Sequence, residues 1–223
     1  MRWPFTPYGS RELLLSVVAL GAVTAAAVWL WPPAAVVPVG LLVLTVAFFR
    51  DPDRTPPEGD DLMVSPADGR VADIEEVREE EFLATDAVRV GVFMSLFNVH
   101  VNRAPVDGRV VYRGYRPGKF HNAMSPAAAR ENECSLVGLE LQDGTRVLVK
   151  QIAGVVARRI VTDCEVGAEL RRGARFGMVK FGSRLEVYVP KSADMELCVA
   201  VGDAVRAGRS ALLRLTGSGG HGA

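Results

Sequence analysis

The chain has 223 residues, enough for a membrane segment and one compact domain but few for several independent domains. Its 26 lysines and arginines balance its 26 aspartates and glutamates, so the formal net charge is zero at pH 7. No overall positive field favours a nucleic acid as partner, and we expect none.

Two apolar runs open the chain, Leu13 to Trp31 and Ala34 to Phe49, separated by Pro32-Pro33. At 1.5 Å per residue the first run forms a helix of about 28 Å, roughly the thickness of one bilayer core. The second run is somewhat short for a full crossing. We therefore expect residues 1–50 to form a membrane-anchoring hydrophobic hairpin, which either crosses the bilayer or only enters it.

Arginines flank both ends of this hairpin, Arg2 and Arg11 before it and Arg50 and Arg54 after it. If the hairpin crosses, the positive-inside rule places both ends, and the domain that follows, on the cytoplasmic face of the cell membrane. A cleaved signal peptide is the rival interpretation. The second apolar run argues against it, because cleavage after the first run would leave another hydrophobic segment.

A polar, proline-rich stretch at 51–61 is typical of a juxtamembrane linker. From 62 to 215, short β-type runs recur between turn signals, which predicts a mainly β domain, an antiparallel sandwich or hybrid barrel. The Asp143-Gly144 pair between two runs indicates a hairpin. Met124 to Asn132 and Gly154 to Val161 are the candidate helices, both too short for a parallel βαβ sheet. We expect the Gly-rich tail 216–223 to be disordered.

The three cysteines, Cys134, Cys164 and Cys198, are widely spaced and form no CxxC pair. We interpret them as reduced core residues. With only 3 histidines and no HExxH motif, the chain also lacks the pattern of a zinc peptidase, and we expect no metal.

His100 lies in the stretch FNVHVNRAPVDG, where strand alternation places Asn98, His100 and Asn102 on one face. Taken alone, a histidine beside two asparagines is more often a hydrogen-bonded structural group than a catalyst. His121, in PGKFH beside Lys119, is expected to face the solvent.

Two further residues are ambiguous when read alone. Asp68 stands in VSPADGRV, where it either caps a tight turn or orients a histidine. Ser183 follows Gly182 between two β-type runs, where a Gly-Ser pair is ordinary, and no GxSxG motif surrounds it.

Taken together, these stretches resemble the phosphatidylserine decarboxylase proenzyme family, in particular its short, archaeal-type, pyruvoyl-dependent branch. The resemblance covers the chain from about Phe49 to the last strand, and it rests on FFRDPDR, VSPADGRV, FNVHVNRAPVDG, PGKF with the later ENE, QIAGVVARRIV and FGSRLEVYVP. Longer relatives carry Thr or Ser after the Gly-Ser pair and a second histidine three residues before the catalytic one. Arg184 and Phe97 occupy those positions here, as in the short branch.

The resemblance implies self-cleavage between Gly182 and Ser183, which would give a β chain 1–182 and an α chain 183–223 that remain in one complex. Ser183 would become a covalent pyruvoyl group, so that pyruvate is the cofactor. The resemblance assigns Asp68, His100 and Ser183 to the catalytic triad. The activity that it implies is conversion of phosphatidylserine to phosphatidylethanolamine and CO₂ through a Schiff base, a step of phospholipid biosynthesis.

Two alternatives stay open from the sequence. One is a non-enzymatic, membrane-tethered β-barrel binding module in which the same residues are structural. The other is a pyruvoyl decarboxylase of a different amino-group substrate, because the cleavage machinery does not name the substrate. The apolar hairpin favours a lipid and the membrane as partners, and the sequence leaves homo-oligomerisation open.

Overall fold

The computed structural model describes residues 4–155, 159–180, 182–192 and 195–215. The chain divides into two compact units, Met1–Asp53 and Arg54–Ala223. The tail at 216–223, expected to be disordered, lies outside the described residues.

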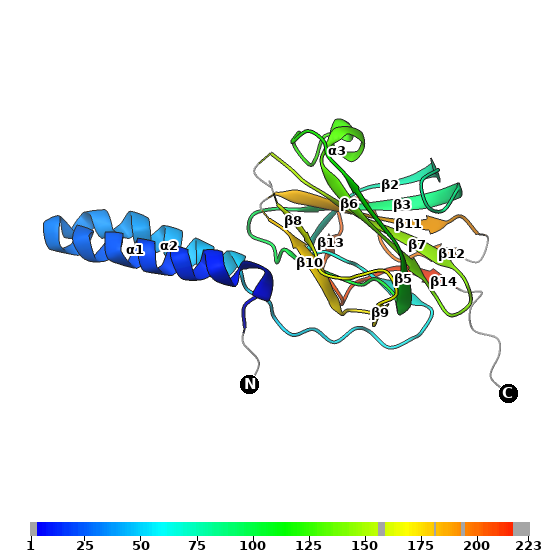
Figure 1. The fold of residues 1–223 in the computed structure, drawn as a ribbon, viewed down its shortest axis with the longest axis horizontal. Coiled ribbons are helices and arrows are strands. Elements are labelled where there is room, and N and C mark those ends of the chain that lie inside the picture. The colour runs from blue at the N-terminus through cyan, green and yellow to red at the C-terminus, as the bar shows by residue number, and fades with distance from the viewer. Residues whose placement is uncertain (1–3, 156–158, 181, 193–194, 216–223) are drawn as a thin grey trace. The chain divides into compact units, whose positions relative to one another are not determined.

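The first unit is a helical hairpin (Figure 1). A short 3-10 helix, η1 (Pro7–Gly9), leads into α1 (Ser10–Leu30), and a second, η2 (Pro32–Ala35), leads into α2 (Val36–Phe48). The helix breaks at the Pro-Pro pair, as predicted, because proline offers no N–H to continue the helical ladder. Two backbone hydrogen bonds close its base, from Thr6 N to Phe49 O (3.0 Å) and from Asp51 N to Pro4 O (2.8 Å).

Both helices carry apolar side chains that the unit itself leaves exposed. Trp29, Val36 and Val43 are 84%, 73% and 63% exposed. Within the described residues, Pro7–Leu30 is the one helical stretch long and apolar enough to cross a membrane, and Pro32–Phe48 is shorter. These lengths match the sequence prediction for the two runs.

The second unit is mainly antiparallel β-structure, as predicted (Figure 1). Its largest sheet has eight strands in the order β13-β2-β3-β11-β7-β6-β5-β9. Their bounds are Ala204–Val205, Gly69–Glu79, Thr85–Met94, Ser183–Pro190, Arg146–Ile152, Cys134–Glu140, Gly108–Arg116 and Glu169–Leu170, respectively.

Two three-stranded sheets complete the β-structure of the described residues. One has the order β1-β14-β12, with bounds Leu62–Val64, Ala211–Leu215 and Met195–Leu197. The other has the order β4-β10-β8, with bounds Val101–Arg103, Arg175–Val179 and Ile160–Thr162. Their apolar side chains, such as Met63 and Phe176, join the main core with one face of the large sheet.

Strand β11 lies at the centre of the large sheet, paired with β3 on one side and β7 on the other. Leu185, Val187 and Val189 pack into the main core. Because side chains alternate along a strand, Arg184 and Glu186 point to the opposite face, which we call the outer face. Both are nonetheless buried, so the outer face carries charged groups away from water.

The two candidate helices had different outcomes. Helix α3 (Pro126–Glu131) lies within the predicted segment Met124–Asn132. The prediction of a helix over Gly154–Val161 is wrong at its described end, because Ile160 and Val161 belong to β8 and pair with β10. Ile160 and Val161 are branched at Cβ, and such residues favour a strand over a short helix. Residues 156–158 lie outside the described part.

The Asp143-Gly144 hairpin is confirmed between β6 and β7, where the Thr145 N–H donates to Asp143 Oδ1 (2.8 Å). Of the cysteines, Cys134 and Cys164 are buried, and burial raises the pKa of both thiols. Cys198 is exposed, so placing it in the core was wrong. It follows β12, which is an edge strand of its sheet.

Candidate active site

The Gly182-Ser183 step lies where β11 begins, with a bend at Gly182. Ser183 is the first residue of β11, stands opposite Met94 of β3 and is fully buried. Its Oγ lies 3.5 Å from the Val179 carbonyl oxygen, at the limit of hydrogen bonding. Gly182 has φ +60°, in the left-handed region where glycine avoids the clash of a side chain.

The Gly182 carbonyl oxygen is packed against a second glycine, Gly154, just after the end of β7. A Cβ placed on Gly154 would lie 1.8 Å from that oxygen and 3.0 Å from its carbon. Such a contact is far inside van der Waals distance, so the approach requires glycine here. Gly154 therefore belongs to the wall around the carbonyl group of the 182–183 peptide bond.

The backbone beside Gly154 is held firmly. The Ala153 N–H donates to the Glu133 carbonyl oxygen (2.9 Å), and the Ala153 carbonyl oxygen accepts from Asn132 Nδ2 (2.8 Å). Asn132 is buried, and its side chain also binds the backbone of His121. Asn132 Nδ2 donates to the His121 carbonyl oxygen, and the His121 N–H donates to Asn132 Oδ1, both at 2.8 Å. A bulkier residue at 154 thus has little freedom to move aside.

His100 is fully buried, and one of its ring nitrogens lies beside a backbone carbonyl. Nδ1 lies 3.0 Å from the Asn98 carbonyl oxygen. Because a carbonyl oxygen only accepts, a ring with a single proton would carry it on Nδ1 and the lone pair on Nε2. In that tautomer, Nε2 is the ring atom that can accept a proton.

Strand register brings His100 toward Ser183. His100 directly precedes β4, in which Val101 pairs with Met178 of β10. One further step along the same antiparallel register places His100 at Val179. The carbonyl oxygen of Val179 is the group that the Ser183 hydroxyl approaches. The two predicted residues therefore converge on one end of β10.

A buried chain of polar side chains supports the backbone of His100. Asn102 Nδ2 donates to the His100 carbonyl oxygen (3.3 Å), and Gln151 Nε2 donates to Asn102 Oδ1 (2.7 Å). Thr162 Oγ1 donates to Gln151 Oε1 (2.7 Å) and lies 2.8 Å from Ser135 Oγ. Sequence reasoning placed Asn102 on the face of His100 but missed Gln151 and Thr162, because their link depends on pairing between distant strands.

Asp68 is not hydrogen-bonded to His100 in this structure. Its carboxylate is bound by Arg54, with Nη1 to Oδ1 at 2.7 Å and Nη2 to Oδ2 at 2.8 Å, and by the Ala207 N–H at 2.8 Å. Both charged side chains are nearly buried. These contacts fit the alternative interpretation from the sequence, in which Asp68 holds a turn. The sequence did not indicate Arg54 as its partner.

The 65–68 turn that contains Asp68 nevertheless adjoins β4. The Arg103 N–H donates to the Pro66 carbonyl oxygen (2.9 Å), and the Val64 N–H donates to the Pro105 carbonyl oxygen (2.9 Å). A shift of this turn would therefore be transmitted to the strand that follows His100. His121, expected to face the solvent, is at the surface with Nε2 3.3 Å from Glu131 Oε2.

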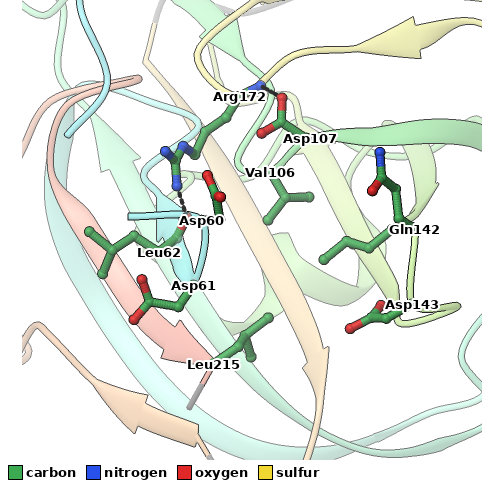
Figure 2. A pocket seen from close by; sticks show the side chains of 10 residues that line it. Asp60, Asp61, Leu62, Val106, Asp107, Gln142, Asp143, Arg172 and Leu215 are labelled. Carbon is green, nitrogen blue, oxygen red and sulfur yellow. Dashed lines mark hydrogen bonds between the residues drawn. The ribbon is translucent and has the colours of Figure 1, made fainter. Parts of the chain in front are cut away.

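A cavity of about 550 Å³ elsewhere in the domain contains none of the predicted site residues (Figure 2). Its wall carries the acidic residues Asp60, Asp61, Asp107 and Asp143. Arg172 ties part of this wall together, through its N–H to Asp107 Oδ1 (3.0 Å) and its guanidinium to the Leu62 carbonyl oxygen (2.8 Å). No group of three metal-binding side chains occurs within the residues that the structure describes.

The chain is similar over most of its length to proteins of one known family. The family described as phosphatidylserine decarboxylase matches residues 41–212, a range that contains Asp68, His100, Gly182 and Ser183. A phosphatidylserine decarboxylase proenzyme from Symbiobacterium thermophilum is 46% identical over 210 residues, 94% of this chain and 96% of that protein. Proteins of the same name from Trichlorobacter lovleyi and Ruegeria pomeroyi are each 45% identical. The match to the Trichlorobacter protein covers 96% of this chain and 94% of that protein, and the match to the Ruegeria protein covers 95% of both chains. With a family match over most of its length, the chain belongs to the phosphatidylserine decarboxylase family.

Proposed function

We propose that this chain is a phosphatidylserine decarboxylase proenzyme that cleaves itself between Gly182 and Ser183. The observation that carries the proposal is the packing of this peptide bond. A buried serine follows a left-handed glycine whose carbonyl oxygen is seated on Gly154. Such a turn holds a hydroxyl and the carbonyl that it would attack in a fixed arrangement away from water.

In the first step of this proposal, the Ser183 hydroxyl oxygen attacks the Gly182 carbonyl carbon. A C–O bond forms and the peptide C–N bond breaks, so that the acyl group moves from nitrogen to oxygen. Loss of the Ser183 α-proton then expels the Gly182 carboxylate and leaves a dehydroalanine. Uptake of water with release of ammonia gives a chain that ends at Gly182 and a chain that begins with a pyruvoyl group.

His100 is the general base in this proposal. Its Nδ1–H is held by the Asn98 carbonyl oxygen, which leaves the lone pair on Nε2 to accept the Ser183 hydroxyl proton. The contacts of Asn102 and Gln151 fix the backbone from which the ring projects. General base catalysis of this kind contributes about 10²- to 10⁴-fold to a rate.

Asp68 acts in this proposal as a positioning residue. Its carboxylate fixes the 65–68 turn through Arg54 and the Ala207 N–H, and this turn is hydrogen-bonded to β4 directly after His100. Removing the carboxylate would therefore displace His100 and slow maturation, without any direct contact between the two side chains.

The position of Ser183 fits a pyruvoyl group, which would be small and covalently part of residue 183. The bare Cα of Gly154 leaves space beside the adjoining carbonyl group, where a Cβ would clash. Once formed, the pyruvoyl group supplies a carbonyl that takes up the electrons released with CO₂. His100 is the residue that we propose to return a proton to the substrate carbon.

The two products of cleavage remain together in this proposal. The α chain 183–223 begins with β11, which pairs with β3 and β7 of the β chain on both edges. Strand β14 likewise pairs with β1. Cutting the bond before β11 removes none of these ladders, so we expect one tight complex of α and β chains.

The exposed apolar side chains of α1 and α2 support a location at the membrane. A diacyl lipid stays in the bilayer, so an anchored enzyme meets its substrate there. We propose the cell membrane as the location, with the catalytic domain on the cytoplasmic face, because arginines flank both ends of the hairpin.

Mass spectrometry of the purified full chain tests the proposal. We expect two fragments that meet at 182/183, with a pyruvoyl group at the start of the smaller one, and CO₂ release from phosphatidylserine in vesicles. Ser183→Ala should leave one intact, inactive chain of about 24.0 kDa. An intact wild-type chain in active membranes would contradict self-cleavage. Equal decarboxylation of free serine would contradict the lipid substrate.

A further inference from the structure

A cavity of about 480 Å³ lies on the outer face of the large sheet, the face that carries Arg184 rather than Ser183. We call it the outer cavity. Helix α3 contributes Ala129 and Arg130 to its wall. Six cationic side chains line it: Arg78, Arg89, Arg116, Arg130, Lys150 and Arg184.

The carboxylates of the outer cavity are already bound by two of these arginines. Asp73 Oδ1 lies 2.6 Å from Arg184 Nη2 and 3.3 Å from Arg89 Nη2, and Glu75 Oε2 lies 2.8 Å from Arg89 Nη2. Behind them, buried Glu186 accepts from Arg184 Nε at 2.8 Å. Glu186 also stands directly across from Lys150 in the pairing of β11 with β7, but within the described residues no carboxylate oxygen forms an ion pair with the Lys150 ammonium.

Lys150 is 7% exposed, and its Nζ donates to the Ala129 carbonyl oxygen at 2.6 Å. Within the described part of the chain, it forms no ion pair with a carboxylate. An ammonium has three N–H donors, so one hydrogen bond to a carbonyl leaves two donors without an acceptor among the described residues. Buried N–H donors in this state are costly unless a ligand accepts hydrogen bonds from them.

Arg130 extends from the last turn of α3, one residue after the carbonyl group that Lys150 holds. Its side chain is exposed, and it has no hydrogen-bond or ion-pair partner among the described residues. Capping of the α3 C-terminus accounts for the bond from Lys150 to Ala129. It accounts neither for the cavity nor for a second unpaired cation at its wall.

We propose that the outer cavity binds a phosphate group, with Lys150 and Arg130 as its principal ligands. A guanidinium binds phosphate oxygens through two parallel N–H donors, and an ammonium adds a compact charge. The volume falls in the range of small-ligand sites and admits either free phosphate or a phospholipid headgroup. Because the cavity lies on the face opposite to Ser183, binding is independent of self-cleavage.

The test uses the full chain in a nonionic detergent that contains no phosphate, with inorganic phosphate and glycerophosphoglycerol titrated separately by calorimetry. We expect binding of at least one, with Arg130→Glu weakening it about tenfold or more, since it loses a charge-assisted bond. The matched control is Arg209→Glu, an exposed arginine outside the outer cavity. Phosphate binding alone identifies free phosphate as the ligand, and binding of the diester identifies a lipid headgroup.

Thermal unfolding of the same variants separates binding from structure. Arg130→Glu should keep the melting temperature or raise it, because the new carboxylate lies near Lys150. Lys150→Met should weaken binding as well, in whatever fraction folds. Binding of neither probe, or binding that Arg130→Glu leaves unchanged, would overturn the proposal.

Discussion

Two turns flank the proposed reaction centre, and they are held in place by opposite means. The turn before β11 requires a glycine at position 154, because the Gly182 carbonyl oxygen occupies the space that a Cβ on Gly154 would fill. The 65–68 turn before β2 depends on a charge pair between Asp68 and Arg54. Because Gly154 has no side chain, the Gly182 carbonyl oxygen can pack directly against it. The ion pair between Arg54 and Asp68 instead stabilises the whole 65–68 turn.

This difference suggests that the two turns have separate roles in the proposed reaction. The turn at Gly182 contains the bond that we propose is cut, where a displacement of about 1 Å would slow the reaction strongly. The turn at Asp68 acts at a distance, through the hydrogen bonds that join it to β4. We therefore expect changes near Gly182 to alter the cleavage rate more than stability, and changes at Asp68 to alter both.

The largest effect is expected from His100, the residue that directly precedes β4. His100→Ala should slow self-cleavage by about 10²- to 10⁴-fold, because no base remains to take the Ser183 proton. The rate is measured as the decay of the intact chain after a pulse of cell-free synthesis. His121→Ala is the control, since that histidine binds Glu131 at the surface, and it should cleave normally. Wild-type cleavage in His100→Ala would remove His100 from the mechanism.

Gly154→Ala should have the next largest effect, slowing cleavage by roughly 10²-fold, because the new methyl group displaces the Gly182 carbonyl. Gly144→Asn is the matched control. Gly144 also follows a strand, but a Cβ there meets nothing within 4 Å, and asparagine tolerates its positive φ. The two variants are compared in the same decay assay, together with their melting temperatures. Equal cleavage rates would show that the close approach does not matter for the chemistry.

The sequence predicted the turn at Gly182 but not the contacts that hold it in place. The alternation of β-type runs located most strands, and the family stretches predicted a site at Gly182, Ser183 and His100. Nothing local marks Gly154 as the neighbour of Gly182 or Arg54 as the partner of Asp68, since these pairs are distant in sequence. The helix predicted over Gly154–Val161 failed for the same reason, because β8 forms only where β10 provides a partner.

Arg54→Gln tests the second turn. Breaking a buried ion pair by removing one partner costs about 3–5 kcal/mol, so urea unfolding should show a large loss of stability. If Asp68 acts by positioning, Arg54→Gln and Asp68→Ala should slow cleavage similarly. The double variant Arg54→Gln/Asp68→Asn should recover part of the stability, because no unpaired charge remains. Fast cleavage in Arg54→Gln beside none in Asp68→Ala would instead indicate that the carboxylate serves His100 directly.

The smallest effect is expected from Asp73, which links the two strands that follow these turns. Burial alone would raise the pKa of Asp73, but the hydrogen bond and charge of Arg184, with the charge of Arg89, bring it below the ordinary 3.8. As pH falls through 3.8, the unfolded chain binds a proton before the folded one does, so folding stability decreases toward the lower folded pKa. For a partly exposed pair the loss is below about 1 kcal/mol. Asp73→Asn should flatten the dependence of the urea midpoint on pH below 5, and an unchanged slope would show that this link contributes nothing.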